Sequence, residues 1–255
     1  MPWAGSPTVV GGAGVYVVAY GGPARECAVR CLESVKRYMP SIGRALVSSE
    51  PLGPETVCLC EKDEDIGARS VKTRMYDVAP QEWEYVLYLD ADTELIAPVP
   101  FLFDVLADGW DMAICVNPGK YAIIKNMVRP DNKEECQYTY DLLGTDQLLQ
   151  LQGGVMSFRR NDRTAALFHA WHDEWHRWAK RDQGALLRAM YANPVKLFIL
   201  GVEWNTSTRY DPVERSAGVL HHQMEARRWK GIINGRLDST EAWGMLHPDF
   251  EDVKR

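Results

Sequence analysis

Short apolar runs alternate with amphipathic stretches along most of the chain. Apolar, β-branched runs predict strands at 15–20, 44–48, 55–60, 86–89, 111–116, 152–158, 195–200 and 217–223. Between them, apolar residues recur every three or four positions and predict helices at 24–38, 69–76, 101–107 and 164–189, the last interrupted at 182–185. Alternating strands and helices indicate an α/β, Rossmann-like fold with a mostly parallel central sheet flanked by helices.

One predicted strand runs directly into two carboxylates. The residues from Val86 to Leu89 are all apolar, which predicts a strand buried on both faces, and Asp90 and Asp92 follow. In extended chain, residues two apart point to the same side, so both carboxylates can converge on a hard cation such as Mg²⁺ or Mn²⁺. Open α/β sheets bind ligands at this end of their strands. The two aspartates can equally begin an ordinary turn.

Composition narrows the class of protein. The 255 residues are 46% hydrophobic, enough for one large domain, and the net charge of −6 argues against broad nucleic-acid binding while leaving room for a local basic patch. The six cysteines form no Cys-x-x-Cys pair, which favours reduced thiols over a zinc ribbon. No stretch has the length of a membrane helix and the start lacks a signal-peptide pattern, so we expect a cytoplasmic protein without membrane contact.

Other polar groups form weaker candidates. Arg69 and Lys72 stand one helical turn apart and can face one anion, or they form an ordinary basic helix face. Two glycines, Gly153 and Gly154, suggest either a close approach of a ligand to the backbone or a bulge. The irregular segment 117–136 is expected to be a lid, an acceptor loop or a surface excursion. A second Asp-x-Asp within 61–65 has polar flanks and is interpreted as a solvated loop.

A late apolar run ends in metal-capable side chains. His221 follows the run directly, His222 comes next, and either imidazole can bind a metal ion. Arg227, Arg228 and Lys230 form a basic cluster that can grip a diphosphate.

Taken in order, these features resemble the GT-A fold glycosyltransferases, especially the glycogenin-like and galactosyltransferase-like enzymes, over about residues 15–230. The resemblance implies one catalytic domain over 1–255, with a nucleotide-binding half at about 1–116 and an acceptor and sugar half at about 117–255. It implies that Asp90, Asp92 and His221 bind Mn²⁺ or Mg²⁺, with His222 as the alternative to His221.

The resemblance also assigns the remaining site residues. Asp182 and Gln183 match the Asp-Gln pair that orients the donor sugar, and we interpret them as catalytic. Either Arg228 or Lys230 would grip the phosphate, because the Gly and Lys-Pro-Trp expected after the histidine are absent. The full set of expected nucleotide and donor contacts is Ala19, Tyr20, Gly21, Arg69, Lys72, Asp90, Ala91, Gln152, Gly153, Gly154, Arg228 and Lys230.

The implied reaction moves a sugar from a nucleotide-diphosphate sugar, by resemblance a UDP-sugar, to a hydroxyl acceptor with retention of configuration. A divalent ion would stabilise the negative charge on the departing diphosphate. The acceptor can be a glycan, a small molecule, a protein or a hydroxylated DNA base, so nucleic acid enters only as an acceptor substrate. The alternatives are a sugar-phosphate nucleotidyltransferase, which the poor glycine-rich loop at 21–25 weakens, and a non-catalytic nucleotide- or sugar-binding module.

Overall fold

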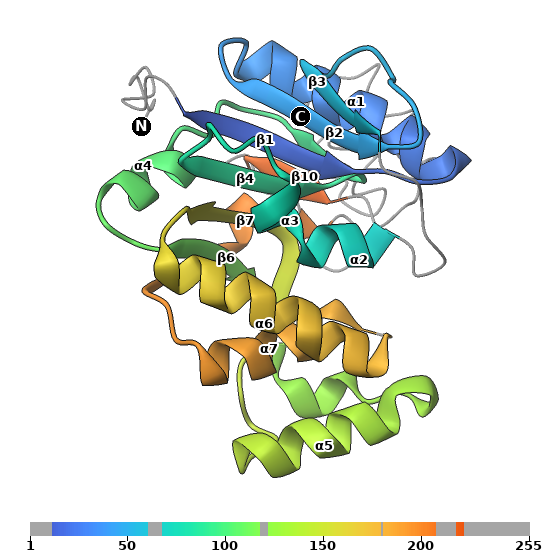
Figure 1. The fold of residues 1–255 in the computed structure, drawn as a ribbon, viewed down its shortest axis with the longest axis vertical. Helices are drawn as coiled ribbons and strands as arrows, with labels where there is room; N and C mark the ends of the chain where they lie inside the picture. The colour runs from blue at the N-terminus through green and yellow to red at the C-terminus, as the bar shows by residue number, and fades with distance from the viewer. Residues whose placement is uncertain (1–11, 61–67, 118–121, 180, 208–217, 222–255) are drawn as a thin grey trace, which may run out of the picture.

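The computed structural model describes residues 12–60, 68–117, 122–179, 181–207 and 218–221. A seven-stranded sheet with the order β3-β2-β1-β4-β7-β6-β8 forms its centre (Figure 1). Its strands are β1 Ala13–Val18, β2 Gly43–Ser48, β3 Val57–Cys60, β4 Tyr85–Asp90, β6 Met112–Val116, β7 Leu151–Arg159 and β8 Leu197–Leu200. The pairs within β3-β2-β1-β4 and the pair β6-β8 are parallel, whereas β7 runs antiparallel to both of its neighbours. The expected mostly parallel sheet is therefore confirmed, with β7 as the exception.

Helices cover both faces of this sheet. The α-helices are α1 Gly22–Tyr38, α2 Ala68–Thr73, α3 Met75–Val78, α4 Phe101–Ala107, α5 Lys133–Leu143, α6 Asp162–Trp178 and α7 Asp182–Ala192. The 3-10 turns are η2 Ile124–Met127, η3 Pro130–Asn132 and η4 Val202–Trp204. Among the described residues, no helix is long and apolar enough to cross a membrane.

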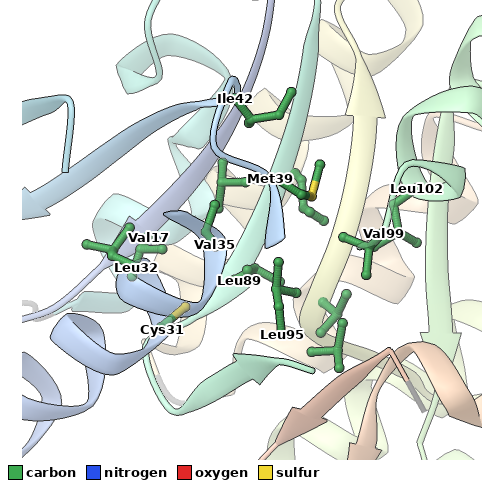
Figure 2. Packing of buried hydrophobic residues seen from close by; sticks show 14 of the residues in the cluster. Val17, Cys31, Leu32, Val35, Met39, Ile42, Leu89, Leu95, Val99 and Leu102 are labelled. Carbon is green, nitrogen blue, oxygen red and sulfur yellow. The ribbon is translucent and has the colours of Figure 1, made fainter. Parts of the chain in front are cut away.

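The apolar core has two layers, one on each face of the central sheet, so β4 is buried on both of its faces. Leu87 and Leu89 belong to the layer beneath α1 and α4, part of which Figure 2 shows. Val86 and Tyr88 belong to the layer beneath α2, α3, α6 and α7. All four side chains are buried, which confirms the interpretation of this apolar run as a central strand.

Several predicted elements are divided in the structure. The helix expected at 69–76 is two short helices, α2 and α3. The helix expected at 164–189 is α6 followed by α7, because Ala179 adopts a left-handed conformation, with φ of 52°, that ends α6. The expected break at 182–185 therefore lies slightly too late, since Asp182 begins α7. The irregular segment after β6 contains η2 and η3 and leads into α5 at Lys133.

A second, three-stranded sheet lies beyond the carboxyl end of β4. It consists of β5 Thr93–Leu95, β10 Val219–His221 and β9 Thr206–Ser207, in the order β5-β10-β9. Of the strand expected at 217–223, the structure describes residues 218–221, and β10 among them lies outside the central sheet. This small sheet brings a late part of the chain beside the residues that follow Asp90.

Candidate active site

Asp90 is the last residue of β4, and the chain turns immediately afterwards. Ala91 and Asp92 form this turn, and the hydroxyl of Thr93 closes it by donating a 2.8 Å hydrogen bond to the carbonyl oxygen of Asp90. The premise that Asp90 to Asp92 stay extended was wrong, because the chain must leave β4 to enter β5. Both acidic residues therefore lie at the carboxyl end of β4, and Asp92 is buried, with 7% of its surface exposed.

The register of the small sheet brings His221 next to this turn. In the antiparallel pair of β10 and β5, His221 lies opposite Thr93, the residue directly after Asp92. The side chain of His221 lies outside the described part of the structure, as do residues 61–67 and 222–255. The expectations for His222, Arg228 and Lys230 fall in that last range.

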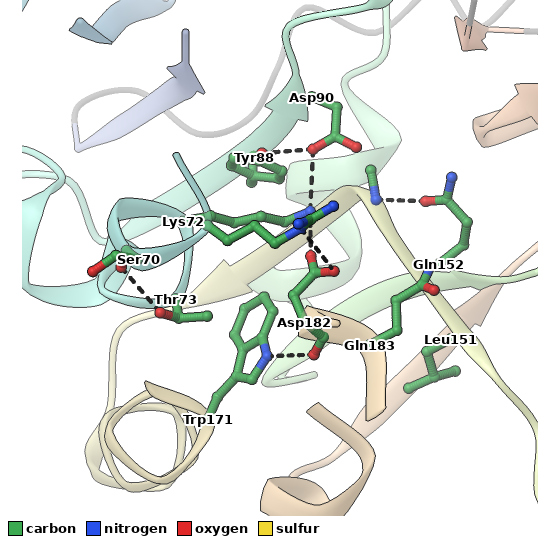
Figure 3. Close-up of polar contacts among 12 residues, drawn as sticks. Ser70, Lys72, Thr73, Tyr88, Asp90, Leu151, Gln152, Trp171, Asp182 and Gln183 are labelled. Carbon is green, nitrogen blue, oxygen red and sulfur yellow. Dashed lines mark hydrogen bonds and ion pairs between the residues drawn. The ribbon is translucent and has the colours of Figure 1, made fainter. Parts of the chain in front are cut away.

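Lys72 joins Asp90 to Asp182, a residue far along the sequence. Its ammonium nitrogen Nζ lies 3.1 Å from Oδ1 of Asp90 and 2.9 Å from Oδ2 of Asp182 (Figure 3). The Lys72 side chain is 9% exposed and lies against Tyr88, with Nζ 4.9 Å from the ring centroid. The hydroxyl of Tyr88 donates a 2.6 Å hydrogen bond to Oδ1 of Asp90. One buried cation therefore connects the end of β4 with the start of α7.

The electrostatics of this cluster keep Lys72 and Asp182 charged. Burial alone would lower the pKa of Lys72, but Asp182 and Asp90 raise it above its ordinary value. Burial alone would raise the pKa of Asp182, but the ammonium of Lys72 and then the guanidinium of Arg69 hold it below its ordinary value. Burial, and then the charge of Asp90, raise the pKa of the Tyr88 hydroxyl well above 10, so it remains a donor.

Asp182 and Gln183 begin α7 and face two other elements. The indole Nε1 of Trp171 on α6 donates a 2.7 Å hydrogen bond to the backbone carbonyl of Asp182 (Figure 3). Nε of Arg69 lies 4.0 Å from Oδ1 of Asp182, so Arg69 and Lys72 both face the carboxylate of Asp182 in this structure. The amide of Gln183 makes a long, 3.4 Å contact with Oδ1 of Asn117, just beyond β6.

The glycine pair of β7 lies in a bulge beside Lys72. Pairing with β6 shifts at this point, so that Ile114 pairs with Met156 while the next residue, Cys115, pairs with Gln152. A Cβ atom on Gly153 would lie 3.4 Å from Nζ of Lys72, so the backbone approaches the cation closely. Of the two alternatives for these glycines, the bulge is therefore present.

The amide oxygen of Gln152 has two donors. It accepts hydrogen bonds from the backbone of Gly154 and, at 2.7 Å, from Nδ2 of Asn205. These bonds hold Gln152 at the bulge, close to the carboxylates.

The expected nucleotide segment lies at the same edge of the sheet. Ala19, Tyr20 and Gly21 connect β1 to α1, and Val18 at the end of β1 pairs with Asp90. Gly21 has a φ of 79°, a value that glycine adopts without strain. The structure thus brings Ala19–Gly21, Ala91, Lys72 and the β7 bulge together around the end of β4.

The donor set fits a hard divalent cation by its chemistry. Asp90 and Asp92 supply carboxylate oxygens, and the β10 register places the backbone of His221 beside them. No group of three metal-capable side chains occurs among the residues that the structure describes. In this arrangement Lys72 supplies the positive charge next to Asp90.

Gln183 also borders a pocket formed by η2, η3, α5 and α7. The pocket measures about 390 Å³ including its open mouth. Its wall combines apolar side chains such as Ile124 and Leu187 with Gln150, Tyr140 and Gln183. It provides a recess next to the start of α7.

Four residues that make these contacts were not predicted from the sequence. Tyr88 could have been found from strand alternation, because it lies two residues before Asp90 and therefore on the same side of β4. No local signal identifies Trp171, Asn117 or Asn205, since each contacts its partner only through tertiary packing.

Comparison with known proteins identifies the fold. No protein-family model matches the chain, and no curated protein sequence matches it either. Solved glycosyltransferase structures share its overall architecture, which shows that the chain has the GT-A fold.

Three of these structures serve as examples. Mouse xyloside xylosyltransferase 1 in its apo form has a TM-score of 0.56 and 13% identity, over 83% of this chain and 97% of that one. Galactosyltransferase LgtC in complex with donor and acceptor sugar analogs has a TM-score of 0.55 and 14% identity, over 92% and 95%. The bifunctional glycosyltransferase WbbM has a TM-score of 0.60 and 14% identity, over 96% of this chain and 50% of that one.

Proposed function

We propose that the protein is a cytoplasmic, metal-dependent glycosyltransferase that moves a sugar from a UDP-sugar to a hydroxyl acceptor with retention of configuration. The observation that carries this proposal is the contact of Asp90, at the end of β4, with Asp182 through Lys72. Two carboxylates that the sequence separates widely thereby meet at the edge of the sheet where α/β folds bind ligands. The shared fold of solved glycosyltransferases supports the same conclusion.

Each part of the site has a proposed role. Asp90, Asp92 and His221, or His222 in its place, would hold Mn²⁺ or Mg²⁺, which when bound stabilises negative charge on the leaving diphosphate. Lys72 and Arg69 have the charge and position to contact diphosphate oxygens, because both already face a carboxylate at the site.

The remaining contacts come from both halves of the domain. The backbone at 19–21 would bind the base, and the bulge at 152–154 would contact the donor. Arg228 or Lys230 would add a phosphate contact. In this proposal, residues up to about 116 bind the nucleotide, and residues from about 117 onwards bind the sugar and acceptor.

Asp182 and Gln183 would act on the donor sugar. A carboxylate kept ionised beside the sugar stabilises the positive charge that develops at the anomeric carbon. Among the described residues no carboxylate stands out as a nucleophile, so a front-face displacement would account for retention. Gln183 also borders the pocket beside α7, which gives the acceptor hydroxyl a route of approach.

The decisive experiment is a screen of nucleotide sugars that measures Mn²⁺-dependent release of nucleoside diphosphate. The donor found in this screen is then offered to arrays of glycans, small molecules, proteins and hydroxylated DNA, and NMR assigns the anomer of the product. We expect Asp92→Ala to abolish release, while Asp108→Ala, at an exposed position after α4, leaves it unchanged. Pyrophosphate release from UTP and a sugar phosphate, without turnover of any nucleotide sugar, would refute the proposal in favour of a nucleotidyltransferase.

A further inference from the structure

Arg188 on α7 is buried beneath the start of that helix. It is 1% exposed, and its guanidinium donates in three directions. Nε donates to Oε2 of Glu174 on α6 at 2.7 Å, Nη1 to Oγ1 of Thr139 on α5 at 2.7 Å, and Nη2 to Oε1 of Glu135 on α5 at 3.2 Å. One side chain thus connects α7 to both neighbouring helices.

Such a buried ion cluster adds little to the free energy of unfolding compared with apolar side chains in its place. Removing Arg, Glu and Glu side chains from water is costly, and well-packed apolar residues of similar volume often leave a protein equally stable. A guanidinium, in contrast, fixes the angles between its partners, because its donors lie in one rigid plane. The cluster therefore specifies how α7 sits against α5 and α6 more than it adds to stability.

The cluster contacts the turn of α7 that carries Asp182. A Cβ atom on Gly184 would lie 3.2 Å from Oε1 of Glu135 and 3.3 Å from Nη1 of Arg188, so this turn rests directly on the ion pair. On the other side of the same turn, Asp182 receives Nε1 of Trp171 at its carbonyl and Nζ of Lys72 at its carboxylate.

We infer that the Glu135–Arg188–Glu174 cluster positions Asp182 for its part in the reaction, with Gly184 as the close contact between cluster and helix. This inference rests on the proposed function, since it assigns the cluster to the geometry of the same site. On this inference the cluster affects the donor sugar through Asp182, although Glu135 and Gly184 also line the pocket beside α7. A displacement of about 1 Å at a reacting group can lower the rate about 100-fold.

The first test replaces the whole cluster, with Glu135→Leu, Arg188→Met and Glu174→Gln combined. Thr139 keeps a partner in this variant, because its hydroxyl also donates to the carbonyl of Glu135 at 2.8 Å. We expect a folded protein whose kcat for nucleoside diphosphate release falls about 10- to 100-fold. The affinity for UDP with Mn²⁺ should change less than about twofold, because the diphosphate contacts lie on other elements.

The second test is Gly184→Ala, which keeps every charge. Alanine favours a helix over glycine, but its methyl group would lie 3.2 Å from Oε1 of Glu135, so stability alone does not test the inference. A cluster that only stabilises the fold predicts unchanged turnover. The inference instead predicts lower kcat, because the added methyl group pushes the turn off the ion pair. Arg163→Gln serves as the control, since it removes an arginine at the start of α6 that pairs with Asp111, just before β6, and with no member of the cluster in the described residues.

The readout that needs no activity is the indole N–H of Trp171. We expect its NMR signal to shift and its protection from hydrogen exchange to fall at least about tenfold in both variants, and not in the Arg163→Gln control. An unchanged Trp171 signal, or unchanged kcat in a folded variant of an active enzyme, would overturn the inference. If the Trp171 signal changes but the wild type releases no nucleoside diphosphate from any donor, the proposed function fails and the positioning of α7 by the cluster stands.

Discussion

Replacing Lys72 with Met removes the positive charge that joins Asp90 to Asp182 while nearly keeping the length of the side chain. In the wild type, Nζ lies within 3.1 Å of Asp90 and 2.9 Å of Asp182. The side chain of Asp182 is 14% exposed and that of Asp90 is 27% exposed. After the substitution, both carboxylates face each other across an apolar group, while Arg69 remains 4.0 Å from Asp182.

The contacts of Lys72 determine how much free energy of unfolding the substitution should cost. Removing one partner of a buried ion pair costs about 3–5 kcal/mol, because it leaves an uncompensated buried charge. Asp90 keeps the hydrogen bond from Tyr88 and some contact with solvent, and Met does not have to be stripped of water as an ammonium does. We therefore expect Lys72→Met to lower the free energy of unfolding by about 3 kcal/mol near pH 7.

The pH dependence follows from the two pKa shifts. The pKa of Asp182 is lowered in the folded state, so its contribution is present above its unfolded pKa and disappears as the pH falls through the folded value. The pKa of Lys72 is raised, so its contribution is complete below its unfolded pKa and fades only as the pH rises through the folded value. The difference between Lys72→Met and the wild type should thus be level from about pH 5 to 9 and shrink in acid.

Urea denaturation of the two proteins at several pH values measures this difference. Lys36→Met is the matched control, because Lys36 is an exposed lysine on α1 whose nearest carboxylate oxygen, on Glu33, is 4.0 Å away. A loss below about 1 kcal/mol for Lys72→Met near pH 7, or a loss that persists in strong acid, would refute the electrostatic account of the site.

The same substitution should change metal binding. Because Lys72 already neutralises Asp90, a divalent ion must compete with it for that carboxylate. We expect Lys72→Met to bind Mn²⁺ about tenfold more tightly than the wild type when no nucleotide is present, equivalent to about 1.4 kcal/mol. Titration followed by Mn²⁺ electron paramagnetic resonance measures this affinity, and equal affinities would show that Lys72 and the metal do not compete.

Three further predictions concern the scaffold. A Cβ atom on Gly14 would lie 2.3 Å from the Trp83 ring, so Gly14→Ala should destabilise the fold by about 3 kcal/mol in urea denaturation, and adding Trp83→Leu should restore part of the loss. Hydrogen bonds from neighbouring groups outweigh burial and lower the pKa of Asp111 from 3.8 to about 2, so Asp111→Asn should cost about 2 kcal/mol near pH 7 and lose that difference as the pH falls from about 4 to 2. Burial raises the pKa of Cys31 to about 12 and that of Cys115 still further, so mass spectrometry should find both unalkylated by iodoacetamide near pH 8 until urea unfolds the protein.

The local sequence was sufficient to predict a strand or helix wherever a hydrophobic pattern repeats within that one element. The apolar run before Asp90 predicted a central strand because burial on both faces admits no polar residue, and the structure confirms it. The same reasoning failed for the conformation of Asp92. Pairing of β5 with β10, which no local pattern reveals, requires the chain to turn there.

For the candidate active site, the sequence likewise identified individual residues but not the contacts between them. Asp90, Lys72 and Asp182 were each identified from the sequence, Asp182 only through a resemblance. Their contact was not predicted, because it depends on how α2 and α7 pack at the edge of the sheet. The division of the expected long helix before Asp182 was also placed too late, since a left-handed Ala179 is unusual for a non-glycine residue.

Strand and helix periodicity are local properties of the chain, so the sequence alone predicts most strands of the central sheet and the charged residues at their ends. It does not predict α5, β5 or β9, nor that packing places Lys72 between Asp90 and Asp182 and Arg188 beneath the turn that carries Asp182. Burial explains this difference. An ion pair shielded from water constrains its partners strongly, and that shielding exists only after the helices have packed on the sheet.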